Sequence, residues 1–153
     1  GKKSQVCGIA VSPRVDEVDE NCFRVSSRIN STWGGNICDM VRATRYLEIY
    51  RDDHVLDYVS SQAGPRLMQG LEELQKAFPA LVSNVRGKGL MCAFDLPSPQ
   101  IRDAFLQCAR ENKVLILPCG SRSIRFRPAL NISFEDMDSG LEAIRRSLAK
   151  LSG

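Results

Sequence analysis

The segment at residues 31–36, Ser-Thr-Trp-Gly-Gly-Asn, combines two hydroxyls, two glycines and a helix-capping residue directly before a helical pattern. It is expected to present the Thr32 hydroxyl and free backbone N–H groups at the N-terminus of that helix. Because the positive end of the helix dipole adds to these donors, the segment suits an anion, and phosphate above all. Taken alone, such a segment more often only caps its helix, here through Ser31, Thr32 and Asn36.

Two helical patterns follow this segment. The first covers residues 36–50, with apolar residues spaced by three and four, and the acidic pair at 52–53 ends it. The second covers residues 54–78, and Pro65 predicts a kink or break near Gly64 because proline lacks the N–H that the helix needs. These helices would position the anion-binding segment.

The residues before the segment predict less regular structure. Residues 6–11 are apolar enough for a short buried strand, 12–22 form a polar, acidic loop, and 23–29 predict a weak strand or an extended loop. A domain seldom begins with a core strand, so we expect the chain to be the back part of a longer protein.

Strands and helices alternate after Pro79. The pattern predicts, in order, strand 82–85, turn 86–89, strand 89–96, helix 99–112, strand 114–117, strand 123–127 and a final helix. Ser133 and Asp136 resemble a capping box at the start of the final helix. This order of elements describes a compact α/β layer of about 75 residues.

The composition excludes several classes of protein. The chain is 43% hydrophobic and 25% charged, which is typical of a soluble globular protein, and its net charge of +3 gives no argument for nucleic-acid binding. No apolar run approaches the ~20 residues of a membrane span. The six cysteines form no CxxC pair, and several lie inside apolar patterns. We therefore expect buried free thiols in a reducing compartment, the cytoplasm or, in a eukaryote, the mitochondrial matrix. His54 is the only histidine and is expected at the surface, so no metal site is predicted.

Three motifs in order identify a family. They are Gly-Lys-Lys-Ser-Gln-Val-Cys-Gly at 1–8, Asn-Ser-Thr-Trp-Gly-Gly-Asn at 30–36, and Arg-Gly-Lys-Gly-Leu-Met at 86–91 followed by Ser-Ile-Arg-Phe-Arg-Pro at 123–128. Together they resemble the C-terminal part of the class III, fold-type I aminotransferases, which depend on pyridoxal phosphate. The resemblance covers essentially the whole chain, and it is greatest to the members that act on the terminal amine of L-lysine, followed by those that act on 4-aminobutyrate.

The resemblance implies an α/β fold with two parts. Residues 1–53 would be the end of the large cofactor-binding domain, with its last strand and the interdomain helix, and residues 54–153 the small C-terminal α/β domain. The implied function is transfer of a terminal amino group, from L-lysine or alternatively 4-aminobutyrate, to 2-oxoglutarate. An alternative from another class is a non-catalytic small domain that keeps only the fold and a dimerisation surface.

A lysine near the start of the chain takes the catalytic role in this resemblance. The family's lysine forms a Schiff base with pyridoxal phosphate, and three residues separate it from a pair of small residues. Lys3 matches that spacing to Cys7-Gly8, whereas Lys2 is one residue out of register, and Cys7 replaces a glycine that many members have. Taken alone, a lysine so close to a chain terminus is usually only solvated.

The 30–36 segment and Arg125 complete the implied site. In the family the threonine that corresponds to Thr32 donates its hydroxyl to the cofactor phosphate of the neighbouring subunit of a homodimer, and Ser31 would lie beside it. Arg125 would pair with a substrate carboxylate, or with a glutamate that moves aside between the two half-reactions. Its planar guanidinium suits a carboxylate, and Arg127 is the competing candidate. Asn30 is expected to line the same site.

Other elements of the family's site lie upstream of the matching part. The glycine-rich phosphate loop, the aromatic residue that stacks on the cofactor and the aspartate that holds its pyridine nitrogen are absent from these 153 residues. We therefore expect the 153-residue chain by itself to bind the cofactor weakly and to transaminate little. The turn at 86–89 is expected to be structural, since its two glycines permit a tight reversal of the chain.

Overall fold

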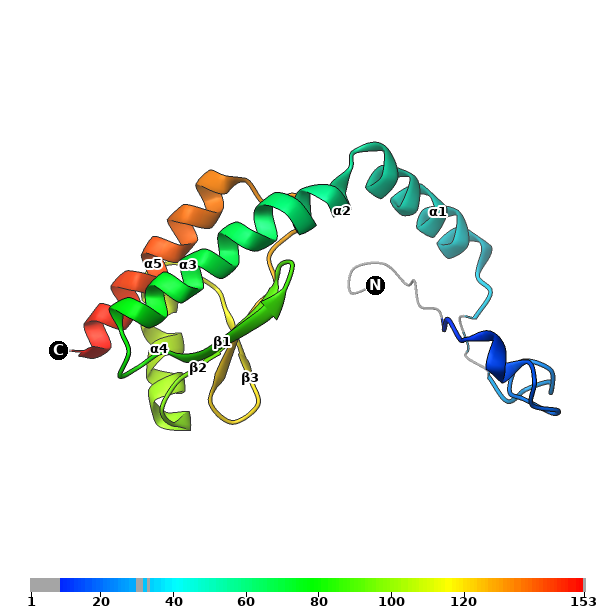
Figure 1. Cartoon of the computed structure of the whole chain (residues 1–153), viewed down its shortest axis with the longest axis horizontal. Helices are drawn as coiled ribbons and strands as arrows, with labels where there is room; N and C mark the ends of the chain where they lie inside the picture. Colours follow the sequence, from blue (N-terminus) through cyan, green and yellow to red (C-terminus); the bar gives the residue numbers. More distant parts are fainter. Residues whose placement is uncertain (1–8, 30–31, 33, 153) are drawn as a thin grey trace. The chain divides into compact units, whose positions relative to one another are not determined.

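The computed structural model of the chain describes residues 9–29, 32 and 34–152. The chain divides into two compact units, Gly1–Asp53 and His54–Gly153 (Figure 1). Over the described ranges, no helix combines the length and the apolar character needed to cross a membrane.

The described part of the first unit contains turns and helices but no strand. A short 3₁₀ helix, η1, covers Pro13–Val15. The Asn21 side chain then organises the following turns, because its amide donates to the carbonyls of Val15 and Val18 and its oxygen accepts from the backbone of Phe23. Residues 23–29 form turns and bends, so the weak strand, one of the two alternatives predicted for them, is wrong.

The predicted buried strand at 6–11 is also wrong for the residues described. Ile9 and Val11 are exposed and have no strand partner among the described residues. A strand must pair its backbone N–H and C=O groups with a neighbour, and the described residues of the first unit offer no other strand. Residues 6–8 lie outside the described part of the chain.

Helix α1, Ile37–Asp52, confirms the first predicted helix. The side chain of Asn36 caps it by accepting from the Asp39 N–H at 3.3 Å, and the helix ends before Asp53. Its apolar positions lie open rather than buried, with Ile37 76% and Leu47 67% exposed. The 3.6-residue periodicity therefore marks an apolar face of α1 against which no other described part of the first unit packs.

The second predicted helix is three consecutive segments. Helix α2, Val55–Tyr58, passes into a π-helical turn, η2, at Val59–Ala63, and α3 follows at Gly64–Ala77. The irregularity lies where Pro65 predicted it, because proline cannot supply the backbone N–H that a continuous α-helix requires there.

The end of the π-helical turn also contacts the tip of the hairpin at residues 83–95. A Cβ placed on Gly64 would lie 2.6 Å from the carbonyl oxygen of Val59 and 2.8 Å from Cα of Gly89. Gly89 itself has a φ of +55°, which favours glycine, and it forms the turn between the first two strands. The close approach of these two backbones therefore requires glycine at 64.

Gly64→Ala is expected to lower the free energy of unfolding by about 1–3 kcal/mol, because the new methyl would overlap backbone atoms that cannot turn away. Gly140→Ala is the matched control, since a Cβ there meets no atom within 4 Å. Because residue 140 lies inside a helix, Gly140→Ala should raise the free energy of unfolding by about 0.5–1 kcal/mol. Urea denaturation of the two variants measures both effects. Equal stability would contradict the close contact.

The second unit contains one four-stranded antiparallel sheet. Its strands are β1 at Ser83–Lys88, β2 at Met91–Asp95, β3 at Leu117–Cys119 and β4 at Ser123–Phe126, in the spatial order β1-β2-β4-β3. Helices α4, Pro99–Glu111, and α5, Phe134–Ser152, complete the unit. The Ser133 hydroxyl accepts from the Asp136 N–H at 3.0 Å, which confirms the predicted cap of the final helix.

Several strand boundaries differ from prediction, most clearly at residues 86–89 and 114–117. The predicted turn at 86–89 is wrong for Arg86–Lys88, because these residues pair with Ala93–Met91 and only 89–90 reverse the chain. The predicted strand at 114–117 begins later, because Leu117 is the first residue to pair with β4. Pro118 is tolerated in β3 because this strand lies at the sheet edge.

One face of the sheet packs against helices α3, α4 and α5 (Figure 1). The core between them contains Leu67, Leu71, Leu74, Cys92, Phe94, Phe105, Ala109, Ile124, Phe126, Met137, Ile144 and Leu148. Phe94 lies near its centre, 5.9 Å from the ring of Phe105 and 5.5 Å from that of Phe126. Since strand side chains alternate, Ala93, Asp95, Ser123 and Arg125 lie on the opposite face.

Candidate functional site

Thr32 is exposed in the turn that leads to α1. Gly35, three residues on, has a φ of +74° and open space around its Cα. The capping side chain of Asn36 satisfies the Asp39 N–H, which leaves the first two N–H groups of the helix without a capping partner among the described residues. Free backbone N–H groups at a helix N-terminus favour an anionic group such as phosphate.

Asp39 is the one negative charge in the first turn of α1. It is buried and pairs with Arg42 at 3.2 Å on the same helix. This ion pair offsets the repulsion that a nearby carboxylate would exert on a phosphate. Lys3, Asn30 and Ser31 lie outside the described residues, so their predicted roles stay predictions.

Arg125 lies in the second unit, in the interior of β4. It stands between Ala93 of β2 and Leu117 of β3, on the sheet face that the helices leave open. The side chain is half-buried and makes no hydrogen bond or ion pair with the part of the chain that the structure describes. Arg127 is exposed and follows the last residue of β4. Arg125 is thus the better-positioned of the two arginines for a carboxylate.

Asp95 forms a polar cluster that the sequence did not reveal. It is only 6% exposed and accepts hydrogen bonds from Ser123 Oγ at 2.6 Å, Asn84 Nδ2 at 2.8 Å and Arg86 Nη1 at 2.9 Å. Burial alone raises the pKa of this carboxyl, but the three hydrogen bonds and the charge of Arg86 outweigh burial and lower the pKa to about 2. Asp95 is therefore ionised at neutral pH, and Arg86 has a structural partner.

His54 directly precedes α2 at the surface, 3.3 Å from Asp57, as expected. Across the ranges that the structure describes, no group of three or more His, Cys, Asp or Glu side chains could hold a metal ion. The described cysteines are all free thiols; they are Cys22, Cys38, Cys92, Cys108 and Cys119. Cys92 and Cys108 are buried, as expected, whereas the expected burial is wrong for Cys22, Cys38 and Cys119, which are exposed.

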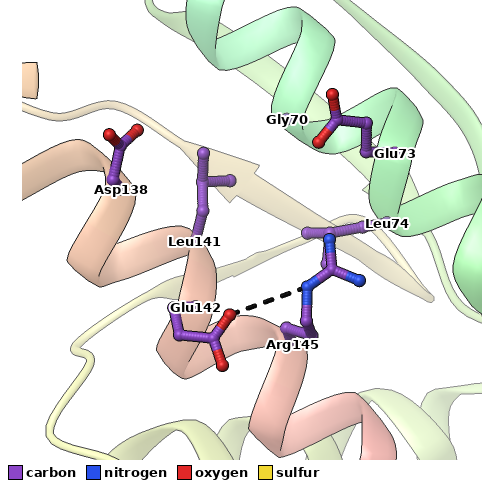
Figure 2. A pocket seen from close by; sticks show the side chains of 7 residues that line it. All are labelled: Gly70, Glu73, Leu74, Asp138, Leu141, Glu142 and Arg145. Atoms are coloured by element: carbon purple, nitrogen blue, oxygen red, sulfur yellow. Dashed lines mark ion pairs between the residues drawn. The ribbon is translucent and has the colours of Figure 1, made fainter.

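A shallow depression lies between α3 and α5 of the second unit (Figure 2). It is lined by Gly70, Glu73, Leu74, Asp138, Leu141, Glu142 and Arg145. Arg145 pairs with Glu142 at 3.7 Å, and Asp138 pairs with Arg66. Three of its charged side chains are therefore engaged in ion pairs, and none of the predicted site residues lines it.

Comparison with known proteins identifies the class of protein. The aminotransferase class-III family matches residues 8–148, and the chain belongs to that family. An L-lysine-epsilon aminotransferase of Amycolatopsis lactamdurans is 52% identical over 97% of the chain. A solved lysine aminotransferase of M. tuberculosis is 45% identical over 99% of the chain, with a TM-score of 0.88. The mitochondrial 4-aminobutyrate aminotransferase of Rattus norvegicus is 39% identical over 71%.

The match is to part of each relative. The chain spans 33% of the Amycolatopsis enzyme, 34% of the M. tuberculosis chain and 22% of the rat enzyme. The predicted family and the α/β fold of a part of a fold-type I aminotransferase are confirmed.

Proposed function

We propose that this chain is the C-terminal part of a pyridoxal-phosphate-dependent aminotransferase that moves the terminal amino group of L-lysine to 2-oxoglutarate. The observation that carries the proposal is the 52% identity over 97% of the chain to an L-lysine-epsilon aminotransferase. The similarity to a 4-aminobutyrate aminotransferase is lower and covers less of the chain, 39% over 71%. That second substrate is therefore the alternative.

The site divides between the two proposed domains, the end of the cofactor-binding domain at 1–53 and the small domain at 54–153. Lys3 would hold the cofactor covalently, and its Nζ would move a proton between the substrate carbon that bears the amino group and the C4′ carbon of the cofactor. When bound, pyridoxal phosphate supplies the electron sink for that proton transfer. Thr32 and Ser31 would donate hydroxyls to the phosphate, supported by the exposed turn before α1.

The substrate would be held by Arg125 and Asn30. Arg125 is a half-buried residue without a carboxylate partner among the described residues, and a substrate carboxylate would complete this arrangement. The site would bind an amino acid in one half-reaction and the 2-oxo acid in the other.

A homodimer with shared sites is the proposed assembly, in which Thr32 contacts the phosphate bound in the partner subunit. The exposed apolar side chains of α1, among them Ile37, Met40 and Leu47, support an interface at this helix. The free thiols of the described cysteines support a reducing compartment, which we propose to be the cytoplasm.

An assay of amine donors tests the substrate. The full-length enzyme, meaning this segment together with the upstream parts that its relatives carry, is given L-lysine, L-ornithine or 4-aminobutyrate with 2-oxoglutarate. L-lysine should have a kcat/KM at least about tenfold above that of L-ornithine, because one methylene in a fitted site is worth roughly that factor. A preference for 4-aminobutyrate would favour the alternative, and no turnover of any donor would favour a non-catalytic module.

A further inference from the structure

Asp95 accepts hydrogen bonds from several side chains at one end of the sheet face that the helices leave open. Its carboxylate accepts from Ser123, Asn84 and Arg86, and Arg122 adds a second guanidinium at 3.9 Å. Arg86 is further fixed by donating to Ser123 Oγ at 3.2 Å and to the carbonyl of Asn84 at 2.8 Å. The Arg86 side chain is therefore turned along the strands toward Asp95.

The strand register places Arg86 in the same row as Arg125. Ala93 pairs with Arg86 on one side and with Arg125 on the other. Residues in such a row share one face of the sheet, and long side chains reach across a neighbour as small as alanine. Without Asp95, the Arg86 guanidinium could lie over Ala93, beside Arg125.

We propose that Asp95 is a positioning residue for the carboxylate site: by holding Arg86 away from Ala93, it leaves Arg125 as the guanidinium of this row that faces the substrate. This inference rests on the proposed role of Arg125. Two adjacent guanidiniums would repel each other and offer a carboxylate two competing positions. A single fixed guanidinium gives one orientation.

A double-mutant cycle in the full-length enzyme tests the inference. Arg125→Ala is introduced alone and together with Asp95→Asn, and kcat/KM for 2-oxoglutarate is measured for each. The penalty of Arg125→Ala should be at least about tenfold smaller in the Asp95→Asn background, because the released Arg86 can take over part of the carboxylate binding. Adding Arg86→Gln to the double variant should restore the full penalty.

Three results separate the possible outcomes. The control Asp138→Asn breaks the Arg66–Asp138 pair between α3 and α5 instead, and it should leave the Arg125→Ala penalty unchanged. Equal penalties in the natural and the Asp95→Asn backgrounds would overturn the positioning role and leave the role of Arg125 intact. No penalty from Arg125→Ala in the natural background would instead overturn the proposed role of Arg125. If Asp95→Asn fails to fold, Asp95→Ser takes its place, and the cycle is read with the same criteria.

Discussion

Replacing Lys3 with alanine in the full-length enzyme should reduce transamination by at least about 10³-fold and abolish the absorbance band of the lysine-bound cofactor. The expected loss is large because one amine has two tasks, to hold the cofactor and to carry the proton. No neighbouring hydroxyl or guanidinium can replace it, since neither forms the same covalent bond to the cofactor. The measurements are the rate with L-lysine and 2-oxoglutarate and the visible absorbance spectrum of the purified variant.

Lys2→Ala is the matched control, because it removes the same charge from the adjacent position. It should keep the absorbance band and most of the activity. The reverse result, with the band lost only in Lys2→Ala, would assign the role to Lys2 and contradict the spacing argument that favours Lys3. Retention of more than a few per cent of activity by Lys3→Ala, with the band intact, would exclude Lys3 as the catalytic residue.

The sequence predicted the second unit well where the signals are local. The final helix follows the predicted cap at Ser133. The same local rule holds in the first unit, where helix α1 begins directly after the capping residue Asn36. Ile124 and Phe126 are buried in β4, as their alternation with the arginines predicted. Each of these features depends on residues within about one helical turn or strand, so periodicity and capping chemistry are sufficient to find them.

Features that depend on distant partners were predicted less well. Whether Arg86 belongs to a turn or a strand depends on whether Met91–Ala93 pair with it, and the start of β3 depends on where β4 offers a partner. The two glycines at 87 and 89 favour a turn at either position, and only the pairing decides that residue 89 makes it. Local propensity cannot decide between such alternatives.

The candidate site shows the same limit. Thr32 and Arg125 could be found from motifs, since each belongs to a short, recognisable segment. Asp95 could not, because its partners Arg86 and Ser123 lie 9 and 28 positions away in the sequence. The sequence shows only an aspartate near the end of the apolar run at 89–96, and this does not indicate which cation it binds.

Replacing Arg125 with alanine should lower kcat/KM for 2-oxoglutarate by about 10²- to 10³-fold in the full-length enzyme. Loss of one partner of a buried charge pair costs about 2–5 kcal/mol, because the remaining carboxylate would be desolvated without a counter-charge. The half-buried position of Arg125 inside β4 supports a value in this range rather than that of an exposed ion pair. Steady-state kinetics with varied 2-oxo acid measures the effect.

Arg127→Ala separates the site from the general charge of the strand. Arg127 is exposed beyond the end of β4. Its replacement removes the same charge as Arg125→Ala but leaves the half-buried Arg125 in place to bind the substrate. It should change kcat/KM by less than about fivefold, as expected for a screened surface charge. A larger loss in Arg127→Ala than in Arg125→Ala would transfer the carboxylate-binding role to Arg127. Because the two arginines carry the same charge close together in the chain, a long-range charge effect would be similar for both, and only a direct contact can explain a difference of about a hundredfold between them.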